Sequence, residues 1–200
     1  MTSRRRFLHL LFVASLIAGV RLSLVVPVAA QSRTTLPPPH LGYGVHIGPH
    51  TSASPALVDQ LRMDWVKVYE PGQIPAFSHK RILFRMDLPW PSNWEAFRLS
   101  VRQRAAELAA LGVDAIEVHN EPNLALEWPH SPNAWEYTQM LRVAYTQIKA
   151  VAPQIIVVSG GLAPTITTGD RGAISDIDYA AEMLDNGAAQ WFDAFGYHPY

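Results

Sequence analysis

The stretch AIEVHNEPNL, Ala115–Leu124, decides the fold because a short apolar run passes directly into polar residues. In an extended chain successive side chains point to opposite faces, so the isoleucine and valine share one face. Glu117, His119 and Glu121 share the other face. The pattern predicts a strand whose apolar face meets helices and whose ionisable side chains point into an enclosed interior.

Strand-like and helix-like segments alternate on both sides of this stretch. Strands are expected at residues 42–48, 65–70, 81–89, 115–122, 155–161 and 192–200, and helices at 55–62, 92–111, 131–151 and 176–186. Such alternation predicts a parallel sheet covered by helices. The first strand lacks the G-x-G-x-x-G phosphate loop of doubly wound sheets, which favours a (β/α)8 barrel. These barrels need about 250 residues, so six strands predict an incomplete barrel, truncated after the sixth.

Helix starts are predicted from capping residues. Ser92 and Glu95 have the spacing of a capping box, and Gly112 follows the end of the same predicted helix. Ser131 followed by Pro132 is typical of a cap with proline in the first turn. We therefore expect the two longest helices to begin at these serines.

The inward-facing Glu117 predicts a charge partner, because an isolated ionised carboxylate is costly to bury. In the neighbouring strands Lys67 and Arg85 have the parity that points inward. We expect Glu117 to pair with one of these two cations.

The first 40 residues predict an export segment and a linker. Residues 1–30 have a basic start, a long apolar stretch and a small-residue end, as in a signal peptide removed after Ala30. The stretch SRRRFLH indicates a twin-arginine signal, with an ordinary secretory signal or an uncleaved anchor as alternatives. Residues 31–40 contain three consecutive prolines and indicate a linker before the domain at 41–200. We therefore expect a secreted or extracytoplasmic protein that contacts a membrane only if the signal is not cleaved.

Composition excludes several classes of function. The chain has 200 residues, 48% of them hydrophobic, and a net charge of -1. These values indicate one globular domain, and the lack of a basic block in residues 41–200 argues against a nucleic-acid partner. Cysteine is absent, which excludes thiol nucleophiles, thiolate metal sites and iron–sulfur clusters.

The segment IEVHNEPNL resembles the clan-A glycoside hydrolases, above all the β-xylosidase/α-iduronidase family, with cellulase-like relatives. In those families the fourth strand ends in Asn-Glu-Pro. The resemblance implies that Glu121 is the general acid/base and that Asn120 hydrogen-bonds the 2-hydroxyl of the sugar. FDAFGYHPY, residues 192–200, resembles the sixth strand of the clan, which implies that His198 and Tyr200 line the cleft. His119 stands where the family commonly has tryptophan, which leaves the subfamily open.

The resemblance also implies an activity. It implies retaining hydrolysis of O-glycosidic bonds in an oligosaccharide, polysaccharide or other glycoside, without a cofactor. The nucleophile of the family follows the seventh strand, which these 200 residues do not contain. We therefore expect the isolated chain to be inactive or nearly so.

Three further residues are candidates for the site. His46 ends the first strand and is either a sugar contact or a core histidine. Arg85 is either a substrate contact or a structural charge partner. Trp128 follows the fourth strand, where its ring could stack on the apolar face of a sugar.

Two other functions remain open from the sequence. Six residues could meet at a metal-dependent barrel mouth: His46, His50, His119, Glu121, His130 and His198. The first strand has no H-x-H pair and the chain has no HExxH motif, so no metal is assigned. The lack of a second catalytic carboxylate favours the other alternative, a degenerate barrel that binds carbohydrate without catalysis.

Overall fold

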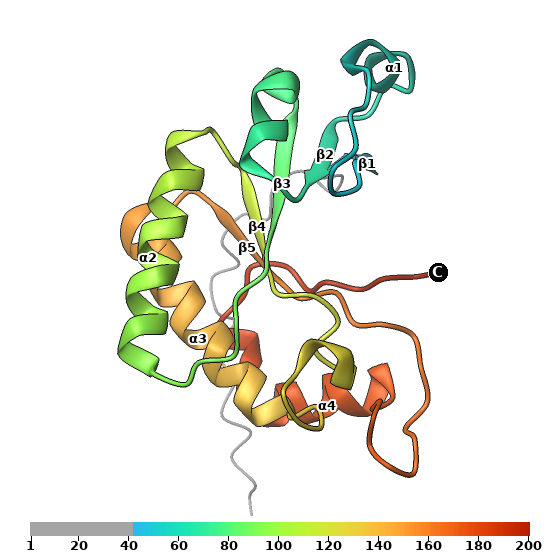
Figure 1. Cartoon of the computed structure of the whole chain (residues 1–200), viewed down its shortest axis with the longest axis vertical. Helices are drawn as coiled ribbons and strands as arrows, with labels where there is room; N and C mark the ends of the chain where they lie inside the picture. Colours follow the sequence, from blue (N-terminus) through green and yellow to red (C-terminus); the bar gives the residue numbers. More distant parts are fainter. Residues whose placement is uncertain (1–41) are drawn as a thin grey trace, which may run out of the picture. The chain divides into compact units, whose positions relative to one another are not determined.

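A computed structural model describes residues 42–200 of the chain. The predicted signal at 1–30 and linker at 31–40 lie outside these residues. The elements are β1 (Gly44–His46), α1 (Pro55–Gln60), β2 (Trp65–Val68), η1 (Pro71–Phe77), β3 (Arg81–Met86), α2 (Trp94–Ala110), β4 (Ala115–Val118), η2 (Ala125–Glu127), α3 (Ala134–Val151), β5 (Ile156–Ser159), α4 (Asp176–Asp185) and η3 (Ala188–Gln190). Strands and helices alternate in the order that the sequence predicts (Figure 1).

The five strands form one parallel sheet in the order β1-β2-β3-β4-β5. Glu117 lies at the centre of its pairing, opposite Arg85 of β3 and Val158 of β5. Sequential parallel strands with helical crossovers are the arrangement of part of a (β/α)8 barrel. The predicted fold class, an incomplete barrel of this type, is confirmed.

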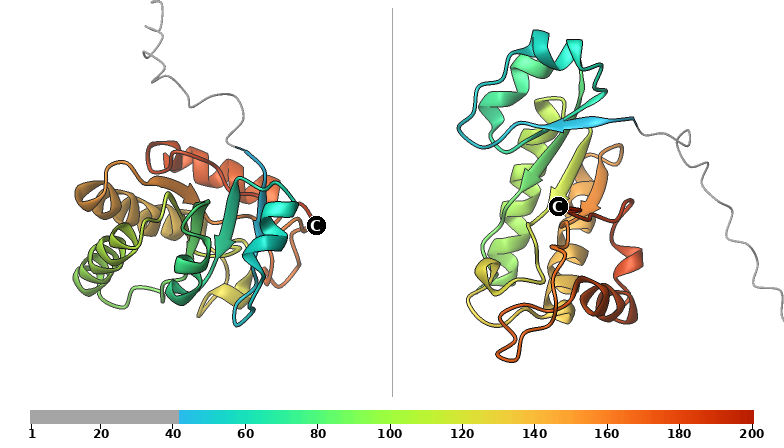
Figure 2. Two further views of the ribbon diagram at one scale, coloured as in Figure 1. Left: turned by 90° about the horizontal axis from the view of Figure 1, so that it is seen from above. Right: turned by 90° about the vertical axis from the view of Figure 1, so that its right-hand side faces the viewer.

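The two faces of the sheet differ as the strand alternation predicts. One face is apolar and buried, and α2 and α3 lie side by side along it (Figures 1 and 2). Its side chains belong to one core: Val66, Val68, Ile82, Phe84, Met86, Ile116, Val118 and Val157. The other face carries the intervening residues: Trp65, Lys67, Leu83, Arg85, Glu117 and Val158 line a pocket. Helix packing therefore leaves the polar strand positions to form a site.

The two longest helices begin later than predicted. The cap of α2 is Asn93, not Ser92: its Oδ1 accepts the backbone N–H groups two and three residues later, both at 3.0 Å. The cap of α3 is Asn133, which accepts the N–H of Glu136 at 3.1 Å, so the predicted start at Ser131–Pro132 is also wrong. Asparagine is as effective an N-cap as serine, and in both helices the asparagine directly precedes the first helical residue.

The predicted sixth strand at 192–200 is not a regular strand. The segment follows β5 through two isolated bridges, Val158 with Ala194 and Leu162 with Tyr197, whose registers differ by one residue (Figure 1). Gly196 lies between them, and a Cβ there would come within 2.3 Å of the Ser159 carbonyl oxygen. Close backbone approach at this glycine interrupts the ladder, but the segment still lies beside β5.

No helix within residues 42–200 is long and apolar enough to cross a membrane.

Candidate functional site

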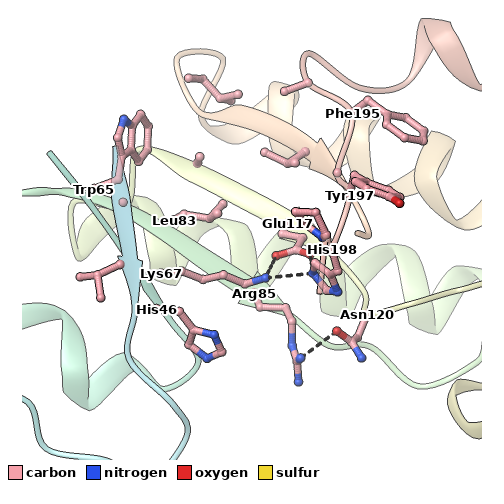
Figure 3. Close-up of a pocket in the computed structure, with 18 of the residues that line it drawn as sticks. His46, Trp65, Lys67, Leu83, Arg85, Glu117, Asn120, Phe195, Tyr197 and His198 are labelled. Atoms are coloured by element: carbon pink, nitrogen blue, oxygen red, sulfur yellow. Dashed lines mark hydrogen bonds and ion pairs between the residues drawn. The ribbon is translucent and has the colours of Figure 1, made fainter. Parts of the chain in front are cut away.

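A cavity of about 770 Å³ opens on the inner face of the sheet (Figure 3). Charged and polar side chains lie toward the carboxyl ends of the strands, and apolar ones toward the amino ends. The segment 194–200 closes one side. Of the predicted site residues, His46, Arg85, Asn120, Glu121, His198 and Tyr200 line this cavity, and Trp128 does not.

The turn after β4 orients the central residues. The strand ends at Val118, and the backbone is left-handed at His119 (φ 74°) and Glu121 (φ 30°). Positive φ at residues other than glycine stores strain of the kind found at functional sites. The turn breaks the strand alternation: Asn120 and Glu121 line the cavity, whereas His119 is buried and does not.

His119 therefore does not face the interior, contrary to the prediction. Its Nδ1 accepts the backbone N–H of Asn120 at 2.8 Å, and its ring lies 6.0 Å from that of Trp128. Burial lowers the pKa of His119. A neutral imidazole is the form that this hydrogen bond requires.

Two buried side chains fix the turn that carries Glu121. Asn123 is fully buried; its Nδ2 donates to the carbonyls of Ala163 (2.8 Å) and Ile174 (3.0 Å), and its Oδ1 accepts the Ala163 N–H at 3.0 Å. The Trp128 indole N–H donates to the Pro122 carbonyl at 2.7 Å. The loop after β5 thus holds the Glu121 turn in place.

Trp128 belongs to this support and not to the cavity. Its side chain is buried, and its ring lies 4.7 Å from that of Trp90. Because the Trp128 ring is buried and packed against Trp90, neither face is open to a sugar, and the structure does not support the predicted stacking contact. The aromatic residues that do line the cavity are Trp65, Tyr69, Phe195, Tyr197 and Tyr200.

Glu117 makes the predicted ion pair, and its partner is Lys67 (Figure 3). The carboxylate is only 3% exposed; it also accepts the Gly161 N–H at 3.0 Å and contacts His198 Nε2 at 3.2 Å. Burial alone would raise the pKa of Glu117. The hydrogen bonds from His198, Lys67 and Gly161, together with the Lys67 charge, outweigh burial and lower the pKa.

His198 joins the two carboxylates of the cavity. Its Nδ1 lies 2.9 Å from Glu121 Oε1, on the side opposite the contact with Glu117. The hydrogen bond to Glu117 is the largest cause of a raised pKa at His198; the bond to Glu121 adds to it, while burial and Lys67 oppose it. Tyr200 is 84% exposed, and its hydroxyl lies 3.5 Å from His198 Nδ1.

A second network orients Asn120. Arg85 donates to Asn120 Oδ1 at 2.9 Å (Figure 3), and Asn120 Nδ2 donates to Glu127 Oε1 at 2.7 Å. Arg85 is also held by Asp87 through two bonds of 2.8 and 3.1 Å, and it lies 4.4 Å from the Tyr69 ring centroid. Arg85 is thus both a structural charge partner and a wall of the cavity. Glu127 was not predicted, and its position six residues after Glu121 gives no signal in the sequence.

His46 lies at the rim beside Tyr69, with a ring distance of 4.9 Å and 3.5 Å between Nδ1 and the tyrosine hydroxyl. Burial, and then the Lys67 and Arg85 charges, lower its pKa. A neutral imidazole facing the cavity suits a hydroxyl ligand.

The histidines considered for a metal site are not brought together. His50 pairs with Glu70 at 2.6 Å, and His130 with Glu136 at 3.3 Å, while His119 is turned into the core. In the part of the chain that the structure describes, no group of three or more histidine, aspartate or glutamate side chains is arranged to hold a metal ion.

Comparison with known proteins gives structural neighbours. No protein-family model and no curated protein matches the chain. The fold is similar to that of a family 39 glycoside hydrolase from the gut symbiont Bacteroides cellulosilyticus WH2, with a TM-score of 0.52 and 20% identity over 79% of this chain and 38% of that one. At this identity the likeness shows the fold alone, that of part of a (β/α)8 barrel, over most of the chain.

Two further structures match more weakly. The virulence factor SghA of Agrobacterium tumefaciens, in complex with its substrate analogue salicin, has a TM-score of 0.42 and 14% identity over 67% of this chain and 41% of that one. The AHE enzyme of Alicyclobacillus herbarius has a TM-score of 0.42 and 16% identity over 68% and 40%. The chain spans about two fifths of the length of each solved structure named here.

Proposed function

We propose that the chain carries the acid/base half of a retaining glycoside hydrolase site, with Glu121 as the general acid/base. The observation that carries the proposal is the position of the Glu121 carboxyl. It follows β4 at the carboxyl edge of the sheet, lines the cavity and contacts His198 at 2.9 Å. Reacting groups occupy this end of the sheet in (β/α)8 enzymes, and the fold similarity agrees with it.

The proposed reaction has two steps. In the first, protonated Glu121 gives its proton to the glycosidic oxygen while a carboxylate nucleophile attacks C1 and the C1–O bond breaks. In the second, the Glu121 carboxylate takes a proton from water as the water oxygen displaces the nucleophile from C1. Asn120 sits beside Glu121 with one of its two amide hydrogens engaged by Glu127, so the other is available to a sugar hydroxyl.

The nucleophile of the proposed reaction is a different carboxylate. Among the described residues, Glu117 is the other acid that lines the cavity. Its oxygens are engaged by Lys67, His198 and the Gly161 N–H, and these contacts weaken the carboxylate as a nucleophile. We therefore place the nucleophile outside these 200 residues, about 5 to 5.5 Å from Glu121 as retention requires.

The proposed substrate is a glycoside. Its hydroxyl groups would meet the polar rim formed by His46, Arg85, Asn120 and Tyr200. Residues 1–30 would export the protein from the cytoplasm to a compartment in which glycans are accessible. We propose that this signal is then cleaved.

Chemical rescue tests the proposal on the chain itself. Azide is small enough to take the place of the carboxylate nucleophile that we place outside these 200 residues. It should therefore produce turnover of activated aryl glycosides by the 200-residue chain and yield a glycosyl azide. Without azide we expect no hydrolysis above background. The Glu121→Gln variant is nearly isosteric and should lose azide-dependent turnover of glycosides whose leaving group needs protonation. The matched control is Glu70→Gln, which removes a carboxylate outside the cavity.

The same assay separates the alternative function. The engagement of Glu117 favours a carbohydrate-binding barrel without catalysis, because Glu121 alone cannot complete a two-carboxylate mechanism. Saturable binding of methyl glycosides with no turnover at any azide concentration would support that alternative. Rapid hydrolysis without azide would contradict the assignment of the nucleophile.

A further inference from the structure

Glu117 has no part in the proposed chemistry, yet it is the most deeply buried acid of the cavity. Its carboxylate pairs with Lys67 Nζ and accepts the Gly161 N–H at 3.0 Å, and His198 Nε2 lies 3.2 Å from Oε1 on the third side. An ionised carboxylate only accepts hydrogen bonds, so the lysine and the backbone N–H keep Glu117 ionised whichever His198 tautomer is present. A buried charge held by these two donors is a built feature of the interior.

The contacts of the His198 ring differ on its two sides. Nε2 faces Glu117 Oε1, with Lys67 Nζ at 3.4 Å, while Nδ1 faces Glu121 Oε1 at 2.9 Å and the Tyr200 hydroxyl at 3.5 Å. A neutral imidazole has one N–H and one acceptor nitrogen. An acceptor nitrogen at Nε2 would place its lone pair against the ionised Glu117 Oε1 at 3.2 Å, so Glu117 favours an N–H at Nε2. The tautomer of His198 is therefore set from inside the barrel.

The ring is also held in place sterically. A Cβ added to Gly161 would come within 2.3 Å of His198 Nε2 and 2.4 Å of its Cδ2. The bare backbone of Gly161 therefore lies against the ring edge that faces Glu117. This glycine both donates to Glu117 and leaves room for the ring.

We propose that Glu117 is a positioning residue that fixes the hydrogen on His198 Nε2 and leaves Nδ1 to share one proton with Glu121. That proton moves between Glu121 Oε1 and His198 Nδ1, while the Nε2–H bond to Glu117 stays intact. No other group is consumed or produced. The link to catalysis rests on the proposed function; the proton sharing itself does not.

The arrangement suits a carboxyl group that must alternate between acid and base. When Glu121 holds the proton, its O–H donates to neutral Nδ1. When Glu121 is a carboxylate, the proton on Nδ1 stabilises its charge. The charged and titratable groups around His198 are Lys67 from β2, Glu117 from β4, Glu121 from the turn and Tyr200 from its own segment. His46 of β1 lines the same cavity and interacts with His198 through charge alone. Of these, Glu117 is the one that meets Nε2 with an acceptor.

Nitrogen-15 NMR of the His198 ring in the 200-residue chain tests this inference without any activity assay. Resonances are assigned by their loss in His198→Gln and followed from about pH 5 to about pH 9, the range in which histidine titrates. We expect Nε2 to stay protonated throughout and Nδ1 alone to lose its proton. A neutral form protonated at Nδ1 in the unmodified chain would overturn the proposal.

Two variants and one control complete the test. Glu117→Gln should shift the His198 midpoint to lower pH and abolish the Nε2–H preference. Gly161→Ala, which displaces the ring without touching a charge, should weaken the same preference. The control Glu70→Gln, in contact with His50, should leave His198 unchanged. An unchanged midpoint and tautomer in a folded Glu117→Gln would refute the role of Glu117. If that variant does not fold, the tautomer of the unmodified chain and Gly161→Ala decide.

The outcomes separate this inference from the proposed function. A fixed Nε2–H tautomer together with failed azide rescue would retain the proton sharing and reject the hydrolase. Successful rescue with the opposite tautomer would do the reverse.

Discussion

Removing the Tyr137 hydroxyl, in the variant Tyr137→Phe, should destabilise the junction between β4 and β5. Tyr137 belongs to α3 and is fully buried. Its hydroxyl donates to the Val118 carbonyl at 2.8 Å and accepts the Gly160 N–H at 2.6 Å. The hydroxyl thereby joins the ends of the two strands just before the turn that carries Glu121.

The magnitude follows from these two bonds. Phenylalanine fills the same volume but leaves one buried carbonyl and one buried N–H without a partner. Each such group costs about 1 to 3 kcal/mol, so we expect a loss of about 2 to 6 kcal/mol in the free energy of unfolding. For a domain of this size that corresponds to a fall in Tm of roughly 4 to 24 °C.

Urea unfolding followed by circular dichroism measures this loss. The matched control is Tyr145→Phe on the same helix, because that hydroxyl is partly exposed and lies 3.5 Å from Asp193. The control should lose less than about 0.5 kcal/mol. Equal stability of the two variants, or of Tyr137→Phe and the unmodified chain, would show that the two hydrogen bonds of the Tyr137 hydroxyl do not stabilise the junction.

Three further predictions concern residues around the cavity. The pKa of His198 is raised in the folded chain, so its contribution to stability is complete below about pH 6.5, its unfolded value, and is lost as pH rises through the folded value. The unfolding free energy of the unmodified chain should fall across that window relative to His198→Gln, and parallel urea series would contradict this. Asn123→Ala leaves three buried backbone groups unpaired, which at about 1 to 3 kcal/mol each should cost about 3 to 9 kcal/mol in the same assay; a loss below about 1 kcal/mol would show that water replaces the amide. Trp128→Phe should lower Tm, because the indole N–H bond to Pro122 is lost, yet keep methyl glycoside affinity within about twofold in calorimetry; a tenfold loss would restore Trp128 as a sugar contact.

The inner face of the sheet was predictable because strand periodicity is simple. In a parallel sheet with one face under helices, parity alone assigns Lys67, Arg85 and Glu117 to the interior. The need to neutralise a buried carboxylate then predicts the ion pair. Parity could not choose between the two cations; Arg85 is diverted by Asp87 and Asn120, which leaves Lys67.

The turn after β4 was beyond such reasoning. Alternation predicts His119 inward, but two left-handed backbone positions send it into the core. The contacts that support this turn come from Asn123, 40 residues away from Ala163, and from Trp128. No local pattern shows which face of Trp128 is covered, so its position depends on tertiary packing.

The predicted starts of α2 and α3 and the predicted strand at 192–200 were also wrong, because local sequence patterns do not show which of several competing contacts forms. Ser92 and Ser131 have good capping chemistry, but each competes with an asparagine closer to the helix, and the backbone N–H groups select the nearer acceptor. The pattern of residues 192–200 is typical of a strand, yet Gly196 and the register shift beside β5 reduce the pairing to two bridges.

We propose that Glu121 protonates the departing oxygen, and a leaving-group series measures this proton transfer. In azide-supplemented reactions, the unmodified chain and Glu121→Gln are compared on aryl glycosides that range from acidic dinitrophenols to poorly acidic phenols. General acid catalysis contributes typically about 100-fold or more, and it matters most where the leaving group is least acidic. We expect the variant to keep its rate on dinitrophenyl glycosides and to lose about 100-fold on the poorest leaving groups. A loss that is uniform across the series, or no loss at all, would contradict the proposal.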